Sequence, residues 1–128
     1  MKFEMLVSNM MRMNTIARLW HWRTDIAQHH TTFEQFLTQN EVLTDSLMES
    51  ALGNEFKLNL NEVGVKDGMQ SNYSIDSAID ELKSYRGQIF EAKQFFGESK
   101  EFGTDEFITI LDGVTELTSK TLYLLKLK

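Results

Sequence analysis

Apolar residues recur at intervals of three and four along most of the chain, which is the spacing of one face of an amphipathic α-helix. The sequence contains no proline, the residue that interrupts helices most strongly. The pattern predicts long helices over residues 3–22, 26–52 and 75–96, and a fourth from residue 104 onward. The side chains expected to face the core are Leu6, Met10, Met13, Ala17 and Trp20, then Phe33, Leu37, Leu47 and Ala51, then Ala78, Ile79, Leu82, Ile89 and Phe96, and finally Phe107, Ile110, Leu111, Val114, Leu117 and Leu124.

Polar residues and glycines mark where these helices should begin and end. Residues 23–25 form a short polar break that offers N-cap candidates for the second helix, and this helix should stop at Gly53. Ser74 and Thr104 are the expected N-caps of the third and fourth helices. Because the break at 23–25 is so short, the first two helices should pack as an antiparallel hairpin.

Residues 53–73 have a different character, with three glycines, several asparagines and a two-residue alternation at Phe56, Leu58 and Leu60. A connection of this length is unusual in a compact helical domain. In extended form it reaches up to about 60 Å, which exceeds the length of about 40 Å expected for helix 26–52. The connection can therefore return along the whole bundle, and we expect an all-α four-helix bundle with one long crossover.

The composition fits one globular domain over residues 1–128, with 41% hydrophobic and 25% charged residues. No apolar stretch is long enough to span a bilayer, and the first residues lack the layout of a secretory signal, so we expect a cytoplasmic protein that does not enter membranes. The formal net charge of −6 opposes binding to nucleic acid. Because the chain has no cysteine, a metal ion could be bound here only by nitrogen and oxygen ligands.

Acidic and imidazole side chains form the candidate chemistry of the chain: His21, His30, Glu34, Asp45 and Glu49. Steps of four residues place His30 beside Glu34, and Asp45 beside Glu49, on one face of the second helix. Glu34 and Asp45 are eleven residues apart, roughly 16 Å along a helix, so one metal ion cannot contact both. If the helix packs antiparallel against a two-fold copy, each pair lies opposite the other pair of the partner. We therefore expect a homodimer with two identical sites between its subunits, and the short break places His21 near the start of the second helix.

Simpler interpretations exist for each of these residues. His30 and Glu34 alone form an exposed helix pair that contributes only a few tenths of a kcal/mol, and Asp45 with Glu49 is typical of a solvated acidic face. His29 lies about 100° around the helix from His30, so a surface position or a supporting role is favoured over metal ligation.

Two further groups near the predicted site have structural explanations. The methionines of the first helix favour core filling over metal binding. Trp20 and Trp22 bracket His21, and their plain role is to bury aromatic area at the corner between the first two helices.

The run from His21 to Glu49 resembles the Dps-like ferritins, or miniferritins, whose pattern is His-Trp, then His-x-x-Phe-Glu, then Asp-x-x-x-Glu. The resemblance implies a ferritin-like four-helix bundle in which Fe(II) binds at a two-fold interface and is oxidised by peroxide or dioxygen. It implies that His21, His30 and Glu34 of one subunit face Asp45 and Glu49 of the partner, around one or two iron ions. It also makes Trp22 a wall of the metal pocket.

The chain departs from the family pattern at several points. The interval between His21 and His30 is shorter than in the family, Ser50 stands where the family has arginine, and the lysine-rich tail used by some members for DNA binding is absent. Three alternatives therefore stay open. The homodimer could be complete or belong to a larger shell, and the site could hold Mn or Zn without redox chemistry. The bundle could also be a degenerate, even virus-encoded, module that binds another protein without catalysis.

Overall fold

The computed structural model of the chain describes residues 1–64 and 73–127. These residues form four α-helices and one short 3-10 helix, namely α1 (Phe3–Arg23), α2 (Ala27–Gly53), η1 (Leu60–Glu62), α3 (Ile75–Gly97) and α4 (Thr104–Leu125). The described ranges contain no β-strand. The predicted all-α four-helix bundle is confirmed. The starts of all four α-helices, and the ends of the first three, lie within one residue of those expected from the apolar pattern.

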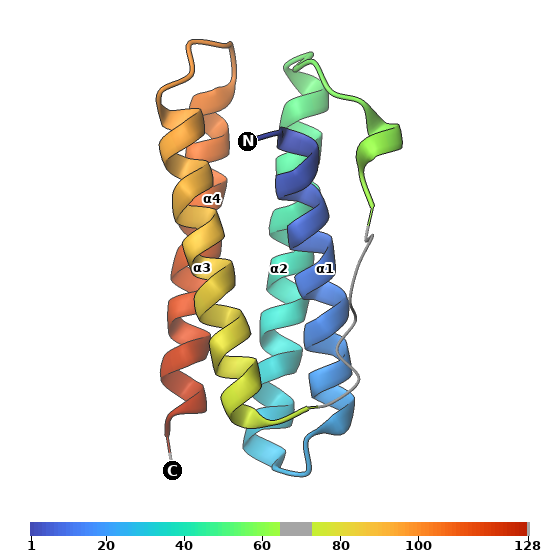
Figure 1. Ribbon diagram of the computed structural model, residues 1–128, viewed down its shortest axis with the longest axis vertical. Helices are drawn as coiled ribbons and strands as arrows, with labels where there is room; N and C mark the ends of the chain where they lie inside the picture. The colour runs from blue at the N-terminus through green and yellow to red at the C-terminus, as the bar shows by residue number, and fades with distance from the viewer. Residues whose placement is uncertain (65–72, 128) are drawn as a thin grey trace.

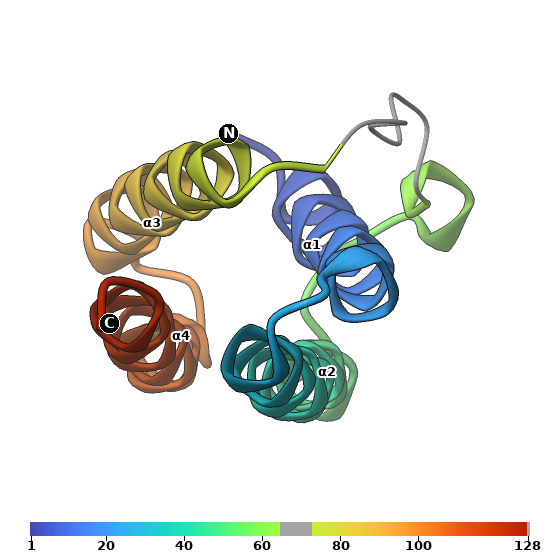
Figure 2. The same ribbon diagram turned by 90° about the horizontal axis from the view of Figure 1, so that it is seen from below.

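The helices pack as two antiparallel hairpins, α1 with α2 and α3 with α4 (Figure 1). Seen along the bundle, α2 also lies beside α4 and α1 beside α3, so the four helices form a ring (Figure 2). Within the described ranges, no helix is long and apolar enough to cross a lipid bilayer.

The connection between α2 and α3 joins opposite ends of the bundle, because α2 ends beside the start of α1 whereas α3 begins at the other end (Figure 1). Its first part lies along α1, where the Asn59 backbone N–H donates to the Glu4 carboxylate at 2.8 Å and the Gly64 N–H donates to the Ser8 hydroxyl at 3.0 Å. The predicted crossover also includes residues 65–72, which lie outside the described residues.

The predicted core stripes on α1 and α2 are buried at every position. On α3 and α4 the stripe shifts slightly, because Ile79, Ile110 and Leu124 are only half-buried whereas Leu122 and Leu125 are buried. At the end of the bundle where α1 begins, four phenylalanines form one aromatic cluster with ring centroids 5.1 to 6.3 Å apart, namely Phe3, Phe56, Phe96 and Phe107. Through Phe56, the connection between α2 and α3 packs against this core.

A chain of polar side chains crosses the centre of the bundle. The Tyr85 hydroxyl donates to Asn40 Oδ1 at 2.8 Å, and Asn40 Nδ2 donates to Asn14 Oδ1 at 2.7 Å and to the Met10 carbonyl at 3.3 Å. Asn14 in turn donates to the Thr44 hydroxyl at 3.3 Å. Buried polar groups are costly unless they are paired, and here each of these side chains finds a partner from another helix or another turn.

The helix caps agree only in part with those expected. Ser74 is the N-cap of α3 and accepts a hydrogen bond from the Ser77 N–H at 3.0 Å, as predicted. The predicted Thr104 cap is wrong, because Thr104 is the first residue of α4 and its hydroxyl donates to the Glu101 carbonyl. The N-cap of α2 is Ile26 rather than a residue of the polar break, and its side chain makes no capping hydrogen bond.

Gly103 and the Glu106 side chain, rather than a threonine cap, hold the start of α4 against the end of α2. Gly103, the N-cap, has φ of 90°, and an added Cβ there would lie 2.8 Å from Asn54 Cγ. Glu106 Oε2 accepts hydrogen bonds from the Ser50 hydroxyl at 2.6 Å and from Asn54 Nδ2 at 2.7 Å. These two hydrogen bonds lower the pKa of Glu106.

Candidate metal centre

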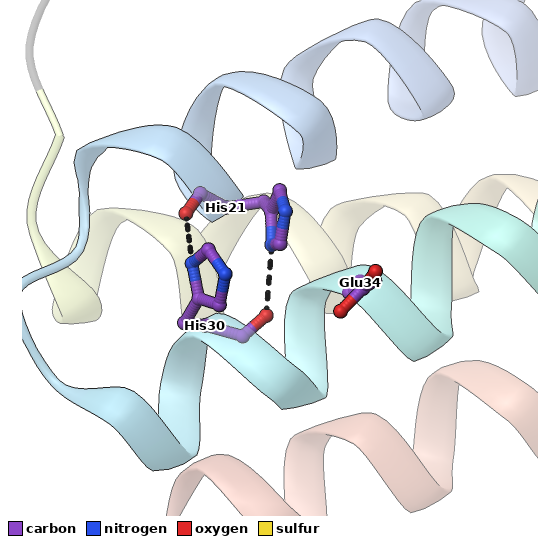
Figure 3. Close-up of side chains that lie close together, drawn as sticks. All are labelled: His21, His30 and Glu34. Atoms are coloured by element: carbon purple, nitrogen blue, oxygen red, sulfur yellow. Dashed lines mark hydrogen bonds between the residues drawn. The ribbon is translucent and has the colours of Figure 1, made fainter.

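Two imidazole rings meet where the α1–α2 hairpin turns. His21 lies in the last turn of α1 and His30 in the first turns of α2, so the antiparallel packing of the two helices brings the side chains together. The rings stack with centroids 3.8 Å apart and planes inclined by 25° (Figure 3).

Each ring is held by the backbone of the other residue. His21 Nδ1 donates to the His30 carbonyl at 2.9 Å, and His30 Nδ1 donates to the His21 carbonyl at 2.7 Å (Figure 3). A carbonyl oxygen can only accept, so each Nδ1 must carry the hydrogen, and in the neutral form of each ring the lone pair is on Nε2. The His21 carbonyl is one of the last four of α1, which lack intrahelical partners, so the His30 ring also satisfies the helix end.

Glu34 completes this group from the next turn of α2 (Figure 3). One possible ligand atom from each of His21, His30 and Glu34 lies within 4.8 Å of the other two. Ligands of one metal ion sit about 2.0–2.2 Å from it, hence at most about 4.4 Å from each other. His30 and Glu34 are exposed, and a small movement of the Glu34 side chain closes this difference.

Two nitrogens and one carboxylate form a donor set that suits borderline and hard cations such as Fe(II), Zn(II) and Mn(II). Histidine ligands characteristically donate their other ring N–H to a carbonyl or carboxylate, which fixes the tautomer and the ring orientation. His21 and His30 already have this arrangement. The residue types present therefore fit a metal ion, and three protein ligands would leave part of its coordination sphere open. Because an imidazole lone pair lies in the ring plane and the two rings are stacked, one ring has to turn before both can bind the same ion.

The structure leaves Asp45 and Glu49 apart from this group, further along the exposed face of α2. The two carboxyl groups lie next to each other, and hydrogen bonding together with like charge from Asp45 raises the pKa of Glu49. Within one chain the five expected ligands are thus divided into a group of three and a pair. The pair has the charge to attract a cation but has no imidazole beside it.

His29 and Trp22 differ from their expected positions. A surface position for His29 is wrong, because the residue is buried and its ring packs 6.4 Å from that of Phe33. His29 stands four residues before Phe33, so the core spacing already carried this information. The expected burial of Trp22 is also wrong, because 66% of the residue is exposed whereas Trp20 is buried.

Comparison of the chain with protein-family models, with curated proteins and with solved structures finds no match. The relation to Dps-like ferritins rests on the residues between His21 and Glu49 and stays a prediction.

Proposed function

We propose that this chain is a Dps-like ferritin subunit, which binds Fe(II) between two copies of itself and oxidises it with peroxide or dioxygen. The observation that carries the proposal is the gathering of His21, His30 and Glu34, of which one possible ligand atom each lies within 4.8 Å of the other two. The helix order supports it as well, since ferritin-type bundles contain one long crossover and α2 ends at the opposite end of the bundle from the start of α3 (Figure 1).

The partner subunit would supply Asp45 and Glu49 to this group. Antiparallel packing of α2 on its copy brings residue 30 level with residue 49 and residue 34 level with residue 45. The assembled site then has two neutral imidazoles and three carboxylates, whose mutual repulsion a bound cation relieves. Added negative charge also favours the ferric product over the ferrous substrate, because the product carries one more positive charge.

The electron count follows from the substrates. Each Fe(II) loses one electron, and one peroxide accepts two, so two ferrous ions are consumed for each peroxide reduced to water with two protons. The chain's own role is to position Fe(II) and to stabilise the ferric charge. The neutral imidazoles bind without adding charge, and the carboxylates supply the electrostatic preference.

The test is an anaerobic Fe(II) titration of metal-stripped protein followed by addition of peroxide, with ferric absorbance and sedimentation measured together. Saturable binding and rapid oxidation by a dimer are expected. Glu49→Gln should weaken binding and slow oxidation at least tenfold, whereas Glu91→Gln, an exposed change on α3, should leave both unchanged. Unaltered binding and oxidation in a folded Glu49→Gln dimer would overturn the proposal.

A second candidate function is protein binding without catalysis, and exposed aromatic side chains favour it. Phe90, Phe95 and Phe102 are 55%, 48% and 81% exposed on the α3–α4 half of the bundle. Failure of Fe(II), Mn(II) and Zn(II) to bind a folded dimer would decide for this function. Binding of Zn(II) or Mn(II) with no iron oxidation would instead indicate a metal site without redox turnover. The cytoplasmic location remains a prediction.

A further inference from the structure

We propose that Trp22 of each chain inserts into a hollow between α1 and α2 of a second copy of this chain. The inference deepens the proposed function, because it rests on the two-fold packing of α2 that this function requires. It names the contact that would hold the two copies in register beside the metal ligands.

Trp22 has the exposure of an interface residue. It follows His21 directly in the last turn of α1, and 66% of it is exposed, although a tryptophan is mostly buried in a folded chain. Tryptophan is also enriched among the side chains that dominate protein interfaces. Trp20, two residues earlier, is buried in the core. Because two residues turn a helix by about 200°, Trp22 projects from the opposite face of α1.

The receiving hollow lies between α1, α2 and the connection that follows α2. Its volume is about 290 Å³, and its apolar lining comes from Val7, Met11, Met48 and Val63. This volume falls just below the range of about 300–1,000 Å³ typical of sites for small molecules, and it is closer to the scale of one large side chain. Methionine sulfur and methyl groups also make favourable contacts with aromatic rings.

The polar groups of the hollow suit the indole of Trp22. Asn14, Glu41 and Asp45 line it together with the apolar residues. A tryptophan inserted there would bring its indole N–H, which can only donate, to acceptor oxygens. The same approach brings the imidazoles of His21 and His30 towards Asp45. One orientation of the two copies would therefore bring the Trp22 ring to the apolar lining of the hollow and the imidazoles to Asp45.

The helix register brings Trp22 to the same height along the bundle as this hollow of the partner. If residue 30 of α2 lies level with residue 49 of the partner, the two-fold axis crosses α2 near Gln39. Because α1 runs antiparallel to α2, with Asn14 bonded to Thr44 and His21 beside His30, the end of α1 is level with the start of α2. The axis then brings the end of α1 level with the early turns of the partner's α1, where Val7 and Met11 lie.

Disulfide trapping tests this contact directly, because the natural chain has no cysteine. A variant with both Trp22→Cys and Met11→Cys should form a covalent dimer under mild oxidation. The two positions are eleven residues apart on α1, about 16 Å, whereas a disulfide requires Cα atoms within about 7 Å. A bond within one chain is therefore excluded. Each single substitution, and Trp22→Cys combined with Phe90→Cys on α3, should give little covalent dimer.

A second measurement uses no disulfide. Trp22→Ala should raise the dimer dissociation constant at least tenfold in sedimentation equilibrium, whereas Phe102→Ala, which removes another exposed aromatic ring, should not change it. Circular dichroism establishes that each variant folds. A folded dimer that yields no Trp22–Met11 disulfide, with an unchanged dissociation constant for Trp22→Ala, overturns the docking.

Fe(II) titration of the same proteins separates this inference from the proposed function. Covalent dimer without saturable Fe(II) binding supports the docking and overturns the function. Saturable Fe(II) binding by a wild-type dimer, with no crosslink in the cysteine variant and no change in the dissociation constant of Trp22→Ala, overturns the docking alone. A chain that stays monomeric at all concentrations overturns both.

Discussion

The Tyr85 hydroxyl of α3 donates to Asn40 Oδ1 of α2 at 2.8 Å, across the diagonal of the bundle. Burial raises the pKa of Tyr85, so the phenol is protonated at neutral pH and acts as a hydrogen-bond donor. We expect Tyr85→Phe to lower the free energy of unfolding by about 1–3 kcal/mol, because it leaves a buried acceptor unpaired. Urea denaturation measures this change.

The control for this prediction is Tyr123→Phe, which removes a hydroxyl from an exposed residue of α4. Its effect should stay within about 0.5 kcal/mol. Equal stability of Tyr85→Phe and the wild type would mean that the polar chain through Asn40 contributes nothing to the bundle.

Glu106 should make stability depend on pH. Its folded-state pKa lies below the usual value of 4.5 because Ser50 and Asn54 donate to the carboxylate. A lowered pKa gives a stabilising contribution that is present above the unfolded-state pKa and is lost as the pH falls through the folded-state value. We expect Glu106→Gln to be less stable than the wild type at neutral pH, and this difference to shrink in acid.

Thermal unfolding of both proteins across this pH range measures the effect. Glu91→Gln removes one negative charge from the exposed face of α3 and corrects for the change in net charge. A difference between wild type and Glu106→Gln that is constant with pH would contradict the assigned hydrogen bonds.

Gly103 should not tolerate a side chain. Its φ of 90° costs other residues about 1–2 kcal/mol, and an alanine Cβ would meet Asn54 at 2.8 Å. We therefore expect Gly103→Ala to lower the free energy of unfolding by at least this amount. The matched substitution is Gly87→Ala inside α3, where an added Cβ meets nothing within 4 Å. It should raise stability by up to about 1 kcal/mol, and a loss at Gly87 would show that the site needs its glycine for another reason.

The two imidazoles should act as one unit in metal binding. Each ring is oriented by the other residue, so removing either disturbs both. His21→Ala and His30→Ala should each weaken Zn(II) binding at least tenfold, and the double variant should lose less than the sum of the two free-energy changes. Calorimetric titration measures these affinities, with Gln28→Ala at the exposed start of α2 as the control. Strict additivity would count against a shared site.

The apolar spacing predicted the four helices nearly to the residue because burial of one face determines where each helix can lie. The N-cap of α4 was not predicted, since Gly103 lies against Asn54, a residue far away in the sequence. Ile26 could not be recognised as the N-cap of α2 because local propensity favours polar caps, whereas the Ile26 side chain makes no capping hydrogen bond.

The candidate site, too, could be predicted from the sequence only in part. Helix geometry alone places Glu34 one turn from His30, and Asp45 beyond their reach. The approach of His21 to His30 depends instead on the conformation of three residues between the helices, and on a carbonyl left free at the end of α1. The exposure of Trp22 could have been predicted, since it lies about 200° from buried Trp20 around the helix.

The reciprocal hydrogen bonds between His21 and His30 also change the entropy of any later binding event. Free side chains at a binding site lose rotational freedom when a ligand orders them, and each such loss subtracts from affinity. In this hairpin both imidazole rings lose that freedom when α1 and α2 pack together, so folding, rather than binding, bears the cost. A cation that binds first at one Nε2 atom then meets a ring whose torsion angles are already set.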